Sequence, residues 1–167
     1  MLNEDYKDIL RALVDEKVDF LLVGAYALAA HGYPRATMDI DIWVMPSPDN
    51  ANGVLRALLR FGAPLHNVNR SDFEKEGTVF QIGVAPRRID IITAASGLQF
   101  EPTFRNSLIV DIEGIQLRIP SVDDLVINKR ASGRTKDLAD AEALEELKKS
   151  DRDRPPSREG VLPHHRT

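Results

Sequence analysis

The sequence of 167 residues contains no cysteine, which excludes disulfide bonds and thiolate metal sites. It lacks an apolar run long enough to span a membrane, and its charged N-terminus lacks the apolar core of a signal peptide. The formal net charge of −4 argues against a protein that coats nucleic acid electrostatically, although a local basic patch remains compatible with it. These absences predict a soluble cytoplasmic protein, and the length predicts one domain.

Hydrophobic periodicity and turn residues predict alternating short helices and strands in the first part of the chain. Helices are expected over about residues 4–17, 25–32 and 47–61. A strand is expected over residues 35–44, and the apolar run 19–24 is typical of a buried central strand. The expected N-caps are Asn3 and either Ser47 or Asp49, and Gly32 is expected to end the second helix. The apolar stripe of the first helix comprises Ile9, Leu10, Leu13 and Val14.

The second part of the chain predicts two hairpins followed by two helices. Residues 62–77 are polar and aperiodic, which favours an irregular loop. Hairpin strands are expected over 78–84 and 87–93, and a second hairpin over 107–120 turns at Glu113 and Gly114. Ser121 is an expected helix cap, and Gly133 separates that helix from a last one over 135–149. The inward face of the last helix is expected to contain Leu138, Ala141, Leu144 and Leu147. We expect a folded domain over residues 1–149 and a disordered polar tail over 150–167.

The stretch "RATMDIDIWV" sets two carboxylates into an otherwise apolar strand. Because side chains alternate along a strand, Asp39 and Asp41 face the same way, roughly 6.6–7 Å apart. Two carboxylates that close resist ionisation unless something positive lies between them. A strand that only needed to pack would not require such a pair, although solvent-facing carboxylates on an edge strand remain an alternative.

A third carboxylate, Asp90, lies in the later strand "RRIDIIT". If the two strands pair, Asp39, Asp41 and Asp90 converge and form an oxygen-rich site that suits Mg²⁺. One or two such ions would relieve the repulsion and orient a nucleoside triphosphate. The apolar strand before Gly24 runs directly into a helix, which places backbone N–H groups where phosphates bind well.

These motifs together resemble the polymerase-beta-like nucleotidyltransferase superfamily. The similarity is carried by "LLVGAYALAAHGYPRATMDIDIWV", "RRIDIIT" and "DLVINKRASGRTKDLADAEAL", and it covers most of residues 18–147. The subgroup that looks most similar contains small bacterial enzymes grouped with AbiEii-type toxins and the minimal nucleotidyltransferases. The resemblance implies an α/β (α+β) fold in which helices flank a mixed β-sheet, with further helices at the C-terminus.

The resemblance also implies a reaction and its residues. Asp39, Asp41 and Asp90 would be the metal ligands and catalytic residues, and a nucleoside monophosphate would pass from a triphosphate to a hydroxyl on RNA, protein or a small molecule. Gly24 and Ala25 would contact the nucleotide. The phosphate-binding candidates in the C-terminal helices are Lys129, Arg134 and Lys136, and Asp140, one turn after Lys136, is a candidate to orient that lysine.

One position departs from the family pattern. A serine or glycine is usual after the glycine of the strand–helix junction, whereas this chain has Ala25. A serine hydroxyl is therefore missing, although the backbone N–H remains. This departure keeps open a second hypothesis, a weakly active or inactive nucleotidyltransferase-like binding module, such as the antitoxin of a toxin–antitoxin pair. Neither the acceptor, which includes tRNA and a partner protein, nor the oligomeric state follows from the sequence.

Overall fold

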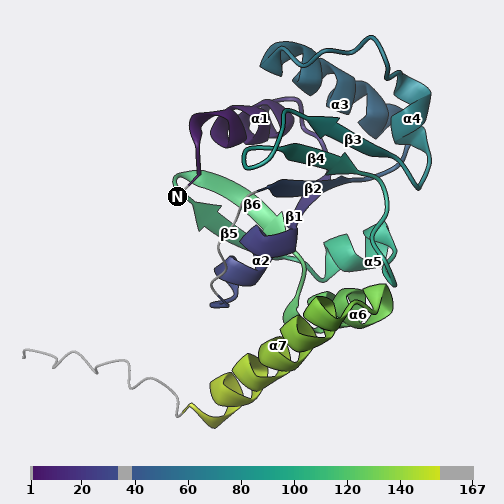
Figure 1. Cartoon of the computed structure of the whole chain (residues 1–167). Helices are drawn as coiled ribbons and strands as arrows, with labels where there is room; N and C mark the ends of the chain where they lie inside the picture. Colours follow the sequence, from purple (N-terminus) through teal and green to yellow (C-terminus); the bar gives the residue numbers. More distant parts are fainter. Residues whose placement is uncertain (1, 34–38, 155–167) are drawn as a thin grey trace, which may run out of the picture.

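The fold is built around a four-stranded mixed sheet with the order β1-β2-β4-β3 (Figure 1). The computed structural model describes residues 2–33 and 39–154. The strands are β1 (Phe20–Val23), β2 (Ile40–Val44), β3 (Val79–Ile82) and β4 (Ile89–Ile92). β2 pairs with β1 in antiparallel and with β4 in parallel orientation, and β3 closes the other side as the antiparallel partner of β4. The expected mixed sheet is confirmed.

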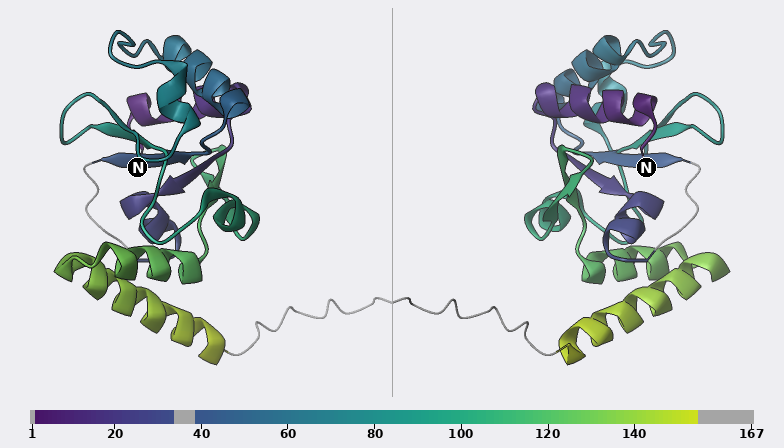
Figure 2. Two further views of the ribbon diagram at one scale, coloured as in Figure 1. Left: turned by 90° about the vertical axis from the view of Figure 1, so that its right-hand side faces the viewer. Right: turned by 90° about the vertical axis from the view of Figure 1, so that its left-hand side faces the viewer.

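Helices cover both faces of this sheet. One face carries α1 (Glu4–Asp15), α3 (Pro48–Phe61) and α4 (Arg70–Glu74), and the other carries α2 (Gly24–Ala30) and α5 (Phe100–Arg105) (Figures 1 and 2). On that second side, α6 (Val122–Ser132) and α7 (Thr135–Asp153) pack against each other beyond α2 and α5. The hairpin of β5 (Leu108–Ile112) and β6 (Ile115–Ile119) forms a separate two-stranded sheet, and β6 packs beside β1.

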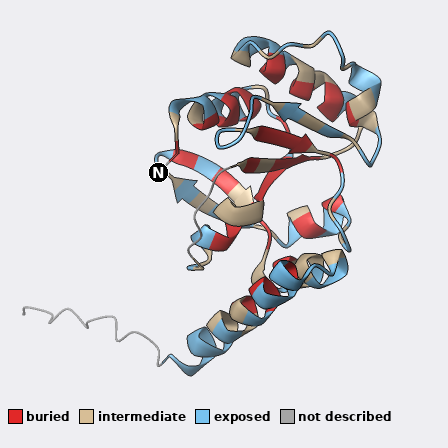
Figure 3. Cartoon of the chain, in the orientation of Figure 1, coloured by how far each residue is buried: buried red, intermediate tan, exposed pale blue. Residues whose placement is uncertain are grey.

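The main core includes the layer between the sheet and the helices α1 and α3, and it continues to buried residues of α2, β6, α6 and α7 (Figure 3). Ile40 and Ile42 of β2 and Ile89 and Ile91 of β4 are all buried and belong to this core. Alternation therefore leaves Asp41 and Asp90 on the opposite face of the same two strands. A smaller core around Trp43 and Phe100, whose rings meet edge to face at 5.2 Å, lies against α5.

The capping residues act as the sequence predicts. The side chains of Asn3, Ser47 and Ser121 accept hydrogen bonds from the backbone N–H groups of Tyr6, Asn50 and Asp124. Each bond satisfies a donor that the first helical turn leaves without a partner. The expected hairpins are confirmed too, and the β5–β6 turn is at Glu113 and Gly114, which both have positive φ.

Several expectations need correction. The segment 62–77 is not wholly irregular, because it contains α4, whose Phe73 is buried. The strand β1 is buried but lies at the end of the sheet order rather than in its centre. Val14 and Leu138 are exposed, by 43% and 41%, because each lies at the margin of its helix's buried face. The inward face of α7 contains instead Asp137 and Asp140 beside Ala141 and Leu144.

One helix boundary also differs from the expected one. The helix α7 continues to Asp153, four residues past the helix end expected at 149. The first part of the strand expected over 35–44 and most of the tail expected over 150–167 lie outside the described residues. Among the residues with a described structure, no helix combines the length and apolar character that crossing a bilayer requires.

Candidate active site

Four charged residues lie on the face of β2 and β4 opposite the main core, namely Asp39, Asp41, Arg88 and Asp90. Asp41 is directly opposite Asp90 in the parallel pairing, and Ile40 is opposite Ile89. Asp39 lies two residues before Asp41, and Arg88 lies two residues before Asp90. Asp39 and Arg88 are therefore also neighbours, at the same end of the two strands. The strands do pair as the sequence analysis required, and the three carboxylates converge.

Arg88 holds two of these carboxylates. Its Nε lies 2.9 Å from Asp90 Oδ1, and its Nη2 lies 3.2 Å from Asp90 Oδ2 and 3.1 Å from Asp39 Oδ2. The backbone N–H of Arg88 also donates to Asp39 Oδ1 at 3.2 Å. The positive group that two neighbouring carboxylates need is therefore supplied by the chain itself. The sequence analysis missed this role, although strand alternation already placed Arg88 and Asp90 on one face.

Asp41 is the carboxylate that Arg88 does not bind in the described contacts. Burial, the negative charge of Asp90 and a hydrogen bond with Asp90 raise the pKa of Asp41 to about 6, and the charge of Asp39 adds to this effect. The attraction of Arg88 lowers the pKa again but does not compensate. The face thus has more negative charge than Arg88 neutralises.

Gly24 brings the start of α2 against this carboxylate. Its φ is +67°, a conformation that glycine adopts without strain. A Cβ at this position would lie 2.3 Å from Asp41 Oδ2, which is far inside van der Waals contact. A glycine is therefore required both by the backbone conformation and by the close approach of the Asp41 side chain.

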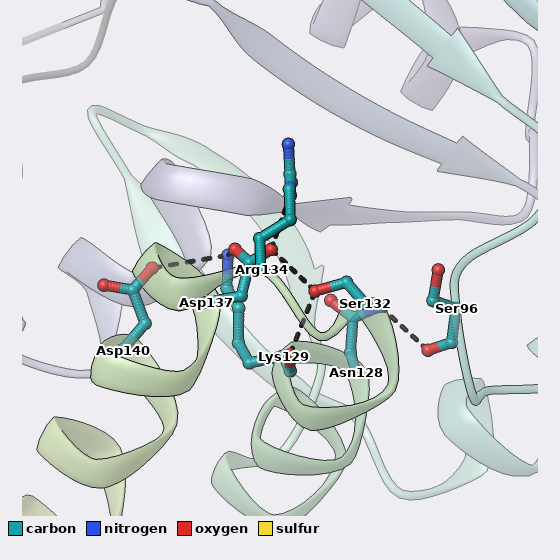
Figure 4. A network of polar contacts seen from close by, with 7 residues as sticks. All are labelled: Ser96, Asn128, Lys129, Ser132, Arg134, Asp137 and Asp140. Carbon is teal, nitrogen blue, oxygen red and sulfur yellow. Dashed lines mark hydrogen bonds and ion pairs between the residues drawn. The ribbon is translucent and has the colours of Figure 1, made fainter.

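The helices α6 and α7 supply the opposite wall through an ionic network around the buried Asp137 (Figure 4). The carboxylate of Asp137, whose side chain is 3% exposed, lies 3.4 Å from Lys129 Nζ and accepts from Arg134 Nε at 2.7 Å. The Ser132 hydroxyl lies 2.6 Å from Asp137 Oδ2. Asp140 forms an ion pair with Lys129 at 3.6 Å, so it helps to orient Lys129, whereas the sequence analysis had assigned it to Lys136.

One cavity of about 490 Å³ is lined by every residue that the sequence predicts to bind metal or nucleotide. The sheet contributes the three aspartates, and α2 contributes its first two residues. The C-terminal helices contribute three cations, so the walls have opposite charge. The predicted residues that line it are Gly24, Ala25, Asp39, Asp41, Asp90, Lys129, Arg134 and Lys136. Three lining residues were not predicted, namely Leu28, Arg88 and Asp137.

A second cavity of about 270 Å³ adjoins the first and shares with it Gly24, Asp41 and Lys129. Its other walls are more apolar and include Ile92 and Leu125. Asn128 also lines it, and its side-chain amide donates to the carbonyl of Ser96 at 3.0 Å (Figure 4). The sequence analysis did not assign a role to Ser96 or Asn128, although Asn128 directly precedes Lys129 in one of the motifs that carry the family resemblance.

The acidic face suits a divalent cation in the kind of donors that it offers. Asp39, Asp41 and Asp90 offer carboxylate oxygens, and both burial and the neighbouring charge of Asp90 raise the pKa of Asp41. Within residues 2–33 and 39–154, however, no three acidic or histidine side chains are grouped so that they already enclose a metal ion. Arg88 lies where such a grouping would form.

The ionic network predicts a pH-dependent stability. Burial would raise the pKa of Asp137, but hydrogen bonds from Ser132 and Arg134 and the charge of Lys129 outweigh it and lower the pKa to about 2. Since the folded pKa lies below the unfolded value, this stabilisation is complete above about pH 4 and is lost as the pH falls towards 2. Asp137→Asn should therefore lower the free energy of unfolding by about 2 kcal/mol at pH 7.

Urea denaturation at several pH values checks this expectation. The deficit of Asp137→Asn should shrink as the pH falls below 4, and Glu142→Gln, an exposed acid on the same helix, should change little at any pH. A variant of Asp137 as stable as the wild type at pH 7 would show that the network does not stabilise the fold.

Comparisons with known proteins identify similar folds and the family of this chain. Over 92% of this chain, the fold is similar to that of TM1012 from Thermotoga maritima, described as a candidate nucleotidyltransferase, with 97% of that chain covered, 18% identity and a TM-score of 0.54. It is also similar to the antibiotic-resistance factor ANT(2'')-Ia, with 89% of each chain covered, 16% identity and a TM-score of 0.51. No curated protein matches the sequence. The model of one family, described as "Nucleotidyltransferase of unknown function (DUF6036)", matches residues 2–154, and the chain belongs to this nucleotidyltransferase family.

Proposed function

We propose that this nucleotidyltransferase is a metal-dependent enzyme that transfers a nucleoside monophosphate from a nucleoside triphosphate to a hydroxyl acceptor. The observation that supports the proposal most strongly is the cavity of about 490 Å³ with one acidic and one basic wall. A triphosphate with a divalent cation carries both charges, so it matches both walls at once.

The proposal gives each wall a task. Asp39, Asp41 and Asp90 would hold one or two Mg²⁺ ions, which neutralise phosphate charge and lower the pKa of the attacking hydroxyl when bound. Lys129, Arg134 and Lys136 would bind the phosphate oxygens from the opposite side. Asp137 and Asp140 keep Lys129 in place, so its ammonium group is oriented before the nucleotide arrives.

The start of α2 would contact the phosphates through its backbone. Gly24 and Ala25 both line the cavity, and the close approach of Gly24 to Asp41 brings backbone N–H groups beside the acidic face. Ala25 offers no hydroxyl, so the contact would rest on main-chain donors and on the basic wall.

The acceptor is a hydroxyl on RNA, including tRNA, on a protein or on a small molecule. The sequence resemblance to the AbiEii-type group would favour a role in a toxin–antitoxin system. The alternative is a weakly active or inactive module that binds nucleotide without transferring it, and the missing hydroxyl at Ala25 favours this alternative.

Thermal unfolding tests the proposal on the wild-type protein. Each of the four nucleoside triphosphates is added alone, with Mg²⁺ and after chelation of the metal by EDTA. A triphosphate together with Mg²⁺ should stabilise the fold by more than the sum of the two separate effects, and the total stabilisation should be roughly 2.7 kcal/mol at a hundredfold excess over the dissociation constant. If no triphosphate shifts the unfolding temperature in the presence of Mg²⁺, the proposal is wrong.

Triphosphates labelled at the α-phosphate then separate the two functions. Incubation with total cellular RNA, total protein and a panel of hydroxyl-bearing small molecules should attach the label to one of these classes. A wild type that binds the triphosphate with Mg²⁺ but labels none of them would support the binding module instead.

A further inference from the structure

The guanidinium group of Arg88 uses the carboxylate oxygens that a divalent cation would need. It contacts both oxygens of Asp90 and one oxygen of Asp39, at 2.9–3.2 Å. A metal ion ligated by the same two carboxylates would compete for their lone pairs and for their charge. The described arrangement therefore allows either the guanidinium or the cation between Asp39 and Asp90.

The backbone of Arg88 is fixed independently of its side chain. The Arg88 carbonyl accepts from the backbone N–H of Ile40 at 3.1 Å and from the Tyr6 hydroxyl at 3.2 Å. Tyr6 is buried, and the pairing of β2 with β4 continues directly from this point. The side chain can consequently leave the carboxylates by rotating its own bonds, while the strand stays where it is.

The released side chain would remain in the same cavity. Arg88 lines the cavity that Lys129 and Arg134 line from the other side, and its side chain is already 34% exposed. Departure from the carboxylates would therefore add a fourth cationic group to Lys129, Arg134 and Lys136, which face a bound triphosphate.

We infer that Arg88 is an internal counter-ion that keeps the acidic face neutralised without metal, is displaced when a divalent cation binds, and then contributes to triphosphate binding. The inference rests on the proposed function. It implies that metal and nucleotide bind cooperatively, because the nucleotide stabilises the released position of Arg88 and the metal creates it.

Metal titration without nucleotide tests the displacement directly. Mn²⁺ binding is measured by isothermal titration calorimetry for the wild type, Arg88→Met and Arg88→Lys. Arg88→Met removes the competing charge and should bind Mn²⁺ on the order of tenfold more tightly than the wild type. Arg88→Lys keeps the charge but cannot hold Asp90 through two nitrogens, so it should lie between the two. The control Arg87→Met, at the neighbouring exposed arginine, should bind Mn²⁺ like the wild type.

Nitrogen-15 spectra of the wild type provide a second readout, which does not depend on how tightly a variant binds metal. The Arg88 Nε–H signal is assigned by its absence in Arg88→Lys, and it should shift when Mg²⁺ saturates the protein, whereas the Arg87 signal should not. An unmoved Arg88 signal at saturating Mg²⁺, or an Arg88→Met variant that binds Mn²⁺ no more tightly than the wild type, would overturn the inference.

Measuring Mg²⁺ binding with and without a triphosphate distinguishes failure of the inference from failure of the proposed function. In the wild type, a triphosphate should tighten Mg²⁺ binding by a larger factor than in Arg88→Met, because only the wild type gains a released guanidinium. An equal factor in both proteins would refute the contribution of Arg88 to triphosphate binding while the proposed function stands. A wild type with no response to triphosphate and Mg²⁺ together would refute the proposed function, whatever Arg88 does to Mn²⁺ binding.

Discussion

Asp41→Asn is expected to abolish the joint stabilisation by triphosphate and Mg²⁺, a loss of roughly 2.7 kcal/mol at a hundredfold ligand excess. Asn keeps the shape of the side chain but removes the negative charge that would bind the metal beside Asp90. Transfer of labelled nucleotide should fall by a factor on the order of 100 or more. Thermal unfolding and the transfer assay measure the two losses. If the variant keeps both responses, Asp41 is not a metal ligand.

The same substitution should have the opposite effect on the metal-free protein. Because the folded pKa of Asp41 is raised to about 6, its proton binds more tightly to the folded than to the unfolded chain. The stabilisation of the fold by proton binding at Asp41 is complete below about pH 4 and is lost as the pH rises through 6. Asparagine stays neutral at every pH, so Asp41→Asn does not lose stability as the pH rises. The variant should be more stable than the wild type by about 1–2 kcal/mol above pH 6, after allowance for solvent screening.

Urea denaturation in EDTA at pH 5 to 8 measures this difference. The exposed control Asp8→Asn should show no such pH-dependent gain. A destabilised Asp41→Asn in EDTA would mean that Asp41 is a structural hydrogen-bond acceptor. The same reasoning does not extend to Asp39, because Arg88 already neutralises it through its side chain and donates to it through its backbone.

Gly24→Ala is expected to damage both the fold and the site. The added methyl group would lie 2.3 Å from Asp41 Oδ2, and alanine is strained at a φ of +67°. The free energy of unfolding should fall by about 2–4 kcal/mol, and the displaced Asp41 should no longer support the joint effect of triphosphate and Mg²⁺.

Gly62→Ala is the matched control for this variant. Gly62 has a φ of +88°, but a Cβ there would meet no atom within 4 Å, so only backbone strain of about 1 kcal/mol is expected. Chemical denaturation compares the two variants. Equal losses would show that the approach of Gly24 to Asp41 adds nothing beyond backbone strain.

The sequence predicts most of the fold because the relevant signals are local. Alternation marks β2 and β4, and side-chain caps mark the starts of α1, α3 and α6. The short helix α4 carries one buried apolar side chain, Phe73, which is too little for a periodic pattern. The buried face of α7 is partly charged, and hydrophobicity assigns Asp137 and Asp140 to solvent because it cannot anticipate Lys129 beside them.

The candidate site depends on one fact that local patterns do not contain, namely which strands pair. Asp39, Asp41 and Asp90 could be named from their faces and from family resemblance, but their convergence required the parallel pairing of β2 with β4. The contact of Arg88 with Asp39 follows from the same pairing. The bridging role of Arg88 between Asp39 and Asp90 therefore could not be predicted before the register was known.

The register of β2 and β4 also determines where the chain tolerates a change in length. A residue inserted in the turn between β3 and β4 would lengthen an exposed segment and leave the pairing intact. A residue inserted between Arg88 and Asp90 would move one of these two side chains to the other face of the strand, among Ile40 and Ile89. That layer is apolar and closed, so the misplaced charge would lie in the core. The site therefore depends on the face of the strand to which each position points as much as on which side chains the strand carries.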